Sequence, residues 1–440
     1  AQINVPRDFW TQVIDIELPP IVRFERQGGG KDAVDRAAKL LSEAKFPVIL
    51  SGAGVVIGDA IDDCKKLAEK LDAPVCNGYQ HNDSFPGSHP LAVGPLGYNG
   101  SKAAMELISK ADVVLALGTR LNPFSTLPGY GIDYWPKSAT IIQVDMNPDR
   151  IGLTKKVTVG ICGDAKMVSQ QLLDKLSSNA GDNGRDERKN LIHQTKSAWL
   201  QTLTGLDHED DDPGTVWNKE ARERDADRMS PRQAWRAIQV GMPEDVIISS
   251  DIGNNCAIGN AYPTFEKGRK YLAPGLFGPC GYGFPSILGA KIGCPDTPVI
   301  GFAGDGAFGI SMNEMSSCAR KEWPAITMVI FRNYQWGAEK RNSILWFDDN
   351  FVGTELDPEL SYAKVANACG LKGVTVKTME ETTAAIKQSC EDQKKGITTF
   401  IEVILNQELG EPFRRDAMKK PVRVAGIKKE DMKPQKSLAN

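Results

Sequence analysis

The stretch Val299-Ile300-Gly301-Phe302-Ala303-Gly304-Asp305-Gly306 places an apolar run directly before an aspartate that is flanked by two glycines. A short run without polar residues is typical of a strand buried on both faces of a parallel sheet. Loops at the carboxyl ends of such strands form the ligand crevice, and glycines there let the main chain approach a phosphate group. The stretch therefore predicts an α/β fold with a ligand site at Asp305.

A second polar residue follows the next apolar run. Asn333 comes just after Thr327–Phe331, so we expect Asn333 and Asp305 at the same edge of one sheet. A divalent ion on a diphosphate needs hard oxygen ligands, which Asp305, the amide oxygen of Asn333 and a nearby carbonyl can supply. The glycine-aspartate-glycine motif alone is also a common turn. The spaced pair is what favours a metal site.

Working outward from this stretch, short apolar runs alternate with helical periodicity on both sides of a polar segment. This alternation predicts two Rossmann-like parallel-sheet domains joined by a charged linker. Ser230-Pro231-Arg232-Gln233 carries the signals of a helix start, and another helix is expected from Ser311. The expected organisation is a connector (1–24), a central domain (25–178), the linker (179–228), a second domain (229–410) and a basic tail (411–440). The expected strands are 46–50, 113–117, 141–144, 246–250, 299–303, 326–331 and 400–405, with a short one near Val75.

Composition excludes several classes of protein. The 440 residues carry 53 basic and 56 acidic side chains, a net charge of -3, which gives no electrostatic reason to expect nucleic acid or a membrane surface as a partner. No apolar run reaches the roughly 18 residues of a membrane-spanning helix. Nine cysteines without a CxxC pair favour reduced thiols over disulfides or a zinc site. We expect a soluble, cytoplasmic protein.

Gly304-Asp305-Gly306 with Asn333 resembles the diphosphate-binding motif of the thiamine-diphosphate-dependent enzymes. The resemblance implies that Asp305, Asn333 and the main-chain carbonyl of Gln335 hold Mg²⁺. It also implies that the main chain of Gly304, Gly306 and Ala307 lies against the diphosphate.

Two further segments are expected at the same cofactor. Asp251-Ile252-Gly253-Asn254-Asn255 follows the strand 246–250, and we assign Gly253, Asn254 and Asn255 to the diphosphate; an Asx-type turn without a ligand is the alternative. The segment 276–285 resembles the family's strand-turn that cups the cofactor. The carbonyl of Gly278 and the amide of Cys280 would then meet the aminopyrimidine. The family usually has a bulky aliphatic residue in place of Cys280, and a role as core filler is the alternative for this thiol.

Enzymes of this family normally begin with a further domain whose glutamate activates the cofactor. No glutamate of this sequence is carried over to that role, so the catalytic residue stays unknown, and Ala1–Asp8 resembles the connector after such a domain. We expect a truncated chain or a first domain on a separate chain. In this family the active site lies between subunits, which implies a homodimer or homotetramer.

The stretches 333–342, 346–353 and 411–416 resemble family members that act on a sulfonated aldehyde. The implied reaction converts sulfoacetaldehyde and phosphate into acetyl phosphate and sulfite. Both substrates are small anions, and Lys340 with Arg341 is the basic pair that the sequence places best to bind them. An ordinary solvated pair of cations is the alternative for these two residues.

Two other functions stay open at this point. One is a carboligase or decarboxylase of the acetolactate-synthase type, which acts on 2-oxo acids and shares the metal motif. The other is a non-catalytic nucleotide-binding protein, against which the pair Asp305 and Asn333 argues. In the central domain, Ser51–Gly54 is too weak a glycine pattern to indicate a dinucleotide, so we expect an empty scaffold there.

Overall fold

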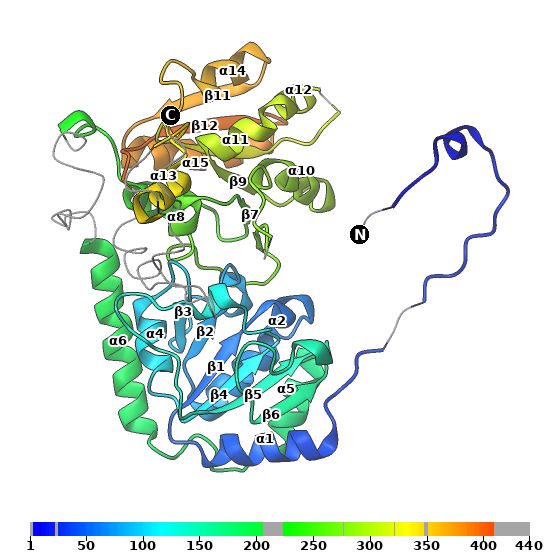
Figure 1. The fold of residues 1–440 in the computed structure, drawn as a ribbon, viewed down its shortest axis with the longest axis vertical. Coiled ribbons are helices and arrows are strands. Elements are labelled where there is room, and N and C mark those ends of the chain that lie inside the picture. Colours follow the sequence, from blue (N-terminus) through cyan, green and yellow to red (C-terminus); the bar gives the residue numbers. More distant parts are fainter. Residues whose placement is uncertain are drawn as a thin grey trace, which may run out of the picture.

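The computed structural model describes residues 3–22, 25–205, 223–275, 277–320, 322–346 and 351–408. These residues form two α/β domains, each built on a six-stranded parallel sheet with helices packed against it (Figure 1). The expected fold class is confirmed. The domain limits stay predictions, since most of the polar part of the linker (206–222) and the basic tail lie outside the described residues.

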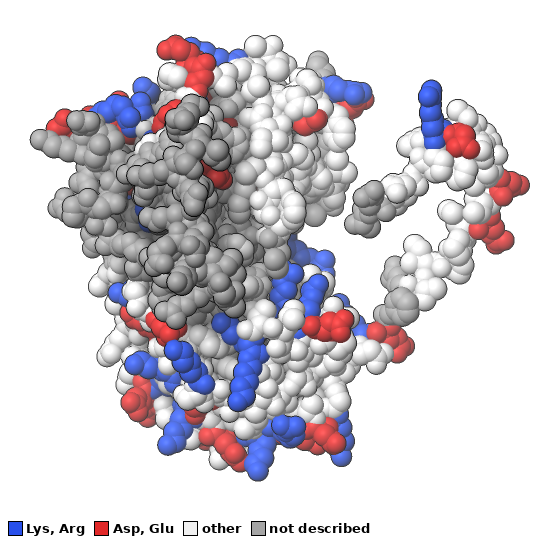
Figure 2. All heavy atoms as spheres, viewed as in Figure 1, with Lys and Arg blue, Asp and Glu red and all other residues white. Residues whose placement is uncertain are grey.

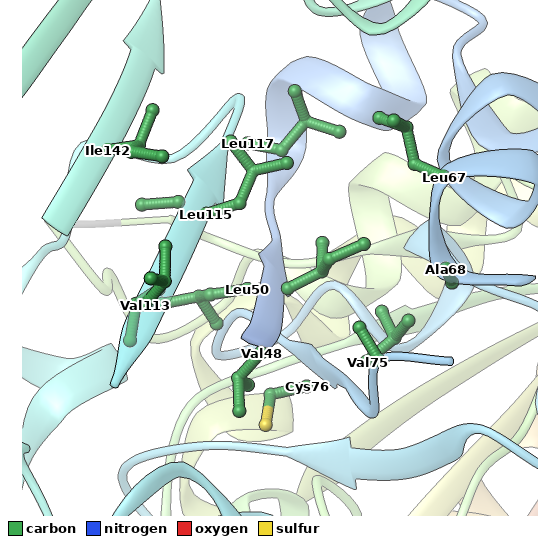
Figure 3. Close-up of a cluster of buried hydrophobic side chains, with 14 of the residues drawn as sticks. Val48, Leu50, Leu67, Ala68, Val75, Cys76, Val113, Leu115, Leu117 and Ile142 are labelled. Carbon is green, nitrogen blue, oxygen red and sulfur yellow. The ribbon is translucent and has the colours of Figure 1, made fainter. Parts of the chain in front are cut away.

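The first sheet has the strand order β3-β2-β1-β4-β5-β6. Its two central strands, β1 and β4, are fully buried because helices cover both faces, and their aliphatic side chains make the core shown in Figure 3. The strands are β1 (Pro47–Ser51), β2 (Val75–Asn77), β3 (Ala92–Pro95), β4 (Val113–Leu117), β5 (Thr140–Asp145) and β6 (Val159–Cys162), and the larger helices are α1 (Lys31–Glu43), α3 (Ile61–Leu71), α4 (Lys102–Ile108) and α5 (Ala165–Lys175).

The glycine loop after β1 packs directly against the loop after β4. A Cβ atom on Gly52 would lie 2.6 Å from the main-chain oxygen of Gly118, and one on Gly54 would lie 2.6 Å from the Cα atom of Gly118. The two loops therefore need glycine for close contact with each other, independently of any ligand.

The second sheet has the order β11-β12-β10-β9-β7-β8 and carries the stretch with which the sequence analysis began. Its centre is again apolar and buried, whereas β11 is mostly half-exposed. The strands are β7 (Ile247–Ser250), β8 (Tyr271–Leu272), β9 (Val299–Gly304), β10 (Thr327–Arg332), β11 (Lys372–Val376) and β12 (Thr399–Ile404). The helices are α8 (Pro231–Gly241), α9 (Asn254–Ile258), α10 (Gly283–Gly293), α11 (Asp305–Ser311), α12 (Met315–Cys318), α13 (Gly337–Trp346), α14 (Tyr362–Ala368) and α15 (Met379–Gln393).

Two helix starts can be compared with the structure. Helical turns do follow Ser311, as the 3-10 helix Met312–Glu314 and α12, but an earlier helix was missed, since α11 begins at Asp305 with Gly304 as its extended N-cap residue. The chain thus turns from strand to helix within the glycine-aspartate-glycine motif itself. The capping box expected at Ser230 is present, with the Ser230 hydroxyl accepting from the Gln233 amide and the Gln233 side chain accepting from the Ser230 amide.

Helix α6 (Arg185–Gly205) lies inside the predicted linker and runs along the side of the first domain toward the second (Figure 1). Ile192 packs into the core of the first domain, and Trp199 lies against Tyr130 of the same domain, with ring centres 5.6 Å apart. Trp199 and Leu203 belong to a hydrophobic cluster made mostly of second-domain residues, and Arg236 of α8 donates to the carbonyl oxygen of Thr204 (3.0 Å). Near the start of the helix, the buried guanidinium of Arg188 donates to five main-chain oxygens, three in the first domain and two in the segment just before the helix: those of Lys45 (2.6 Å), Leu71 (3.0 Å), Asp72 (2.9 Å), Gly181 (2.6 Å) and Asn183 (2.8 Å).

Buried polar side chains of the first domain also bind the main chain of the second. The amide nitrogen of Asn82 donates to the carbonyl oxygens of Asn260 (2.9 Å) and Pro263 (2.8 Å). The carboxylate of Asp83 accepts from the amides of Lys270 (2.9 Å) and Tyr271 (3.2 Å). Because these groups are buried, separating the domains would leave them without partners, which fixes the orientation of the two sheets.

Residues 3–22 form an arm that stands clear of both domains (Figures 1 and 2). The arm is rich in large apolar side chains that are exposed, such as Trp10 (75 %), Val13 (98 %) and Ile21 (90 %). On the bodies of the domains, basic and acidic side chains are interspersed in this view (Figure 2). None of the helices among the described residues combines the length and the apolar character needed to span a membrane.

Candidate active site

The carboxyl ends of β7, β9 and β10 meet at one cavity of about 190 Å³ in the second domain. The polar segments that follow these three strands were predicted to lie together because the strands are parallel neighbours. The structure places eleven of the residues predicted for cofactor or metal on the cavity wall: Gly253, Asn254, Asn255, Gly278, Cys280, Gly304, Asp305, Gly306, Ala307, Asn333 and Gln335.

Three oxygen atoms converge at the floor of this cavity. The side-chain oxygen of Asn333 faces only acceptors, namely Oδ1 of Asp305 and the main-chain oxygen of Gln335. Without an ion, the turned amide would satisfy this arrangement, with hydrogen bonds of 3.3 Å to both of these oxygens and one of 3.2 Å accepted from Nδ2 of Asn255. A carboxylate, an amide oxygen and a carbonyl that face one another are the hard ligands that Mg²⁺ prefers, so this donor set fits that ion. The described residues hold no cluster of three or more His, Cys, Asp or Glu side chains suited to a metal.

Asp305 is buried and its two carboxylate oxygens have different partners. Oδ2 accepts from the amide of Tyr334 (2.7 Å) and from the guanidinium of Arg332 (3.0 Å), whereas Oδ1 accepts from the amide of Gly306 (3.0 Å) on the cavity side. Burial raises the pKa of Asp305 to about 6, against the opposing effects of Arg332 and the two amides. The carboxylate is therefore mostly ionised at neutral pH.

Glycines at the cavity wall carry no side chains and so leave the space of the cavity free. A Cβ atom on Gly304 or on Gly253 would meet no atom within 4 Å, so a side chain there would project into open space. Gly253 has a φ of 120° and Gly278 a φ of 60°, conformations that disfavour other residues. The resulting surface lets backbone amides approach a ligand closely, as a diphosphate group requires.

Asp251 shapes the cavity without lining it. Its carboxylate accepts from the amides of Gly281 (3.1 Å) and Gly283 (2.7 Å), so it ties the end of β7 to the loop that carries Gly278 and Cys280. Asn255, four residues further along the chain, keeps a buried side-chain oxygen that has no hydrogen-bond partner among the described residues. An unsatisfied buried acceptor at a cavity wall indicates a group that receives a donor when a ligand is present.

Cys280 is exposed and lines the cavity, so it does not fill the core. Partial burial raises the pKa of its thiol, and the carboxylates of Asp251 and Glu339 add to that effect. The thiol is therefore neutral at physiological pH and offers the cavity a small apolar surface.

Several residues of the cavity wall were not predicted from the sequence. Trp336 and Glu339 line the cavity because the chain after Asn333 folds back over it and starts α13 at Gly337. A Cβ atom on Gly306 would lie 2.8 Å from the ring of Trp336, so this indole packs directly on the glycine motif. The short spacing between Asn333 and Glu339 is the signal that would have placed both residues near the metal ligands.

The two predicted substrate-binding cations are not on the cavity wall. Lys340 forms an ion pair with Glu355 and lies over the ring of Phe351, and Arg341 is buried. Neither residue is therefore part of an ordinary solvated face. Their role in binding anions stays a prediction. Residues 347–350 and 411–416, which also carried the resemblance, lie outside the described residues.

Comparison with known proteins gives two matches to family models. Residues 34–172 match the central domain of thiamine pyrophosphate enzymes, and residues 251–403 match the C-terminal TPP-binding domain of the same enzymes. The second match contains the cavity described above.

Curated relatives extend the likeness over the whole chain. A probable sulfoacetaldehyde acetyltransferase of Rhizobium meliloti (strain 1021) is 77 % identical over 438 residues, which is 100 % of this chain and 74 % of the relative. The sulfoacetaldehyde acetyltransferase of Castellaniella defragrans is 49 % identical, with 96 % of this chain and 71 % of the relative covered. A probable acetolactate synthase large subunit of Methanococcus aeolicus is 27 % identical, with coverages of 88 % and 64 %.

Proposed function

The chain belongs to the thiamine pyrophosphate enzymes, within them to the sulfoacetaldehyde acetyltransferases, and we propose that it converts sulfoacetaldehyde and phosphate into acetyl phosphate and sulfite. The observation that carries this proposal is the high identity to the sulfoacetaldehyde acetyltransferases, together with a cavity whose oxygen donors fit a magnesium ion. The acetolactate synthases are far less similar to this chain.

The cofactor of these domains is thiamine diphosphate, and we propose how this chain holds it. Asp305, Asn333 and the carbonyl of Gln335 would bind Mg²⁺, and the amides of the chain around Gly304 and Gly253 would meet the diphosphate. When bound, thiamine diphosphate supplies a nucleophilic carbon and an electron sink for a carbonyl substrate. The side chains of Asn254 and Asn255, the carbonyl of Gly278 and the amide of Cys280 are the further cofactor contacts that we propose.

The proposed reaction needs no external oxidant or reductant. The aldehyde carbon of sulfoacetaldehyde is oxidised to the level of an acyl group. The neighbouring carbon is reduced in compensation: it loses the sulfonate group as sulfite and becomes a methyl group. Phosphate oxygen then forms the new bond to the acyl carbon. The protein contributes position and shielding, which the apolar side chains of Trp336 and Cys280 on the cavity wall support.

The test is a direct assay of both products. The enzyme with thiamine diphosphate and Mg²⁺ should release sulfite and form acetyl phosphate in equal amounts from sulfoacetaldehyde and phosphate. It should release no carbon dioxide from pyruvate under the same conditions. Turnover of pyruvate without turnover of sulfoacetaldehyde would instead assign the enzyme to the 2-oxo acid group.

We also propose that the enzyme is a homodimer or homotetramer of the cytoplasm. Apolar side chains flank the cavity loop, since Phe277 is 92 % exposed beside Gly278 and Ile310 is 56 % exposed beside Gly281. Exposed apolar side chains at the rim of a site are typical of surfaces that a partner covers. All nine cysteines are free thiols, which supports a reducing compartment.

The variant Phe277→Asp should shift the enzyme toward smaller species, because the charge would have to be buried at the interface. Light scattering of wild type and variant at matched concentrations measures the shift. Val240→Asp is the control, since Val240 is 66 % exposed on α8 and lies outside the cavity wall. A wild-type enzyme that is fully active as a monomer would contradict the proposal.

A further inference from the structure

A buried arginine lies directly behind the three converging oxygens. Arg332 is the last residue of β10 and immediately precedes Asn333, and only 1 % of its surface is exposed. Burying a guanidinium is costly unless partners surround it, so its contacts define what it does. A buried guanidinium is also unexpected here, because a Mg²⁺ ion is proposed to bind to the neighbouring Asp305.

Both terminal nitrogens of the Arg332 guanidinium have hydrogen-bond partners, whereas Nε has only the ionic contact of 3.8 Å with Glu402. Nη1 donates to Oδ2 of Asp305 (3.0 Å), and Nη2 donates to the main-chain oxygens of Leu360 (3.0 Å) and Asp357. Its plane lies 4.2 Å from the ring centre of Tyr334. The guanidinium therefore links the end of β10 to the loop before α14 and has no freedom to turn.

This arrangement divides the two oxygens of Asp305 between two tasks. Oδ2 is occupied by Arg332 and by the amide of Tyr334. Oδ1 is left on the side of Asn333 and the cavity. A carboxylate held at one oxygen can offer only the other oxygen to a metal, and in one direction.

A second carboxylate compensates the charge of the arginine. Oε1 of Glu402 lies 3.8 Å from Nε of Arg332, and the side chain of Glu402 is 3 % exposed. Its oxygens accept from the Ser361 hydroxyl (2.7 Å), the Tyr362 amide (3.0 Å) and the Thr375 hydroxyl (3.2 Å), which suits an ionised group. Asp305, Arg332 and Glu402 together carry one net negative charge, whereas Asp305 and Arg332 alone would be neutral.

We propose that Arg332 is a positioning residue of the magnesium site: it fixes Asp305 so that Oδ1 faces the metal, and Glu402 restores the negative charge that the arginine removes. This inference rests on the proposed function of the cavity. It makes a prediction whose sign differs from that of simple electrostatics. Charge alone says that removing a cation strengthens Mg²⁺ binding, whereas loss of position says that binding weakens.

The experiment measures the Mg²⁺ concentration needed for half-maximal binding of thiamine diphosphate, by tryptophan fluorescence and by calorimetry. Trp336 lies on the cavity wall and serves as the reporter. We expect Arg332→Met to raise this concentration about 10- to 100-fold, the usual effect of losing a partner that orients a metal ligand. Arg332→Lys should rescue part of the loss because it keeps the charge and one donor.

Arg228→Met is the matched control. The guanidinium of Arg228 lies 5.0 Å from the ring centre of the same Tyr334 but pairs with Asp225 and not with Asp305. Its Mg²⁺ requirement should change less than about twofold, which separates positioning of Asp305 from loss of a stacked cation. Glu402→Gln keeps the geometry and removes the compensating charge, so it should raise the Mg²⁺ requirement while leaving the far-ultraviolet circular dichroism unchanged.

An unchanged or lower Mg²⁺ requirement in Arg332→Met would overturn the inference. If Arg332→Met does not fold, the test uses Arg332→Lys and Glu402→Gln instead. A wild-type Mg²⁺ requirement in both of these variants would also overturn the inference. The wild type is measured first. Cofactor binding that is independent of Mg²⁺ in the wild type would contradict the proposed metal site itself, which distinguishes the two failures.

Discussion

Replacing Asp305 by asparagine should abolish Mg²⁺-dependent binding of thiamine diphosphate and reduce activity about a thousandfold. Asp305 is the one charged group among the three proposed ligands, since an amide oxygen and a carbonyl complete the set. Charges separated by about 4 Å interact with roughly 4 kcal/mol at an effective dielectric constant near 20, which corresponds to about three powers of ten in affinity. Calorimetric titration of cofactor at several Mg²⁺ concentrations measures the loss.

The control for this variant is Asp83→Asn. Asp83 is also a buried carboxylate that accepts from main-chain amides, but it lies between the domains and not at the cavity. Asp83→Asn should lower stability and leave the Mg²⁺ requirement near that of the wild type. Equal cofactor binding by wild type and Asp305→Asn would remove Asp305 from the metal site.

Asparagine is a better test than alanine because Asp305 also serves the fold. From sequence alone, Asp305→Ala is expected to remove a ligand and nothing more. In the structure that change would remove the 3.0 Å ion-pair partner of Arg332, with Glu402 left at 3.8 Å. Both substitutions remove the charge that pairs with Arg332, but asparagine keeps an oxygen that can accept from Arg332 and from the amide of Tyr334. Alanine leaves both buried donors without that acceptor, so Asp305→Ala should unfold more easily than the asparagine variant.

The variant Arg188→Met should lower the free energy of unfolding of the first domain by about 3–5 kcal/mol, the scale of a lost buried charge network. Two of the five main-chain oxygens that Arg188 binds belong to Leu71 and Asp72 at the end of α3. Carbonyl oxygens at the end of a helix have no amide partner within the helix. Methionine fills the space but donates nothing, so these carbonyls would stay buried without partners. Urea denaturation followed by circular dichroism measures the change.

Arg185→Met is the matched control on the same helix. Arg185 forms ion pairs with Asp72 (2.5 Å) and Asp182 (2.9 Å), but its side chain is 38 % exposed. Ion pairs open to solvent contribute at most about 1 kcal/mol, so this variant should change the midpoint only slightly. Similar losses in Arg185→Met and Arg188→Met would show that charge on the helix, and not the buried carbonyl network, stabilises the domain.

The elements that the sequence predicted well are those buried on both faces. The runs 113–117 and 299–303 match β4 and β9 within one residue, because helices cover both sides and every position is apolar. Strands β3, β6, β8 and β11 were not predicted. All four are the edge strands of their sheets, where strands are short or partly exposed, and residues such as those of β11 (Lys372–Val376) carry little apolar signal.

The sequence predicted the site residues that lie at the ends of strands. It did not predict those that a loop brings back to the cavity. Gly304, Asp305 and Asn333 follow buried strands, so parallel pairing was enough to bring them together. Arg332 and Glu402 lie on neighbouring strands, and nothing in the spacing of those two residues points to a shared ion pair with Asp305. Lys340 was placed at the substrate by its proximity in sequence, whereas the turn into α13 directs Glu339 to the cavity and Lys340 to Glu355.

Helix α6 has a mechanical consequence for the whole molecule. At 1.5 Å per residue its 21 residues make a rod of about 30 Å. Arg188 binds one end of this rod to the first domain, and the hydrogen bond from Arg236 of α8 to the carbonyl oxygen of Thr204 binds the other end to the second domain. Tension applied to either domain is therefore carried along hydrogen-bonded backbone into the other. A hinge rotation of one sheet against the other must either tilt this rod as a unit or break its contact with α8.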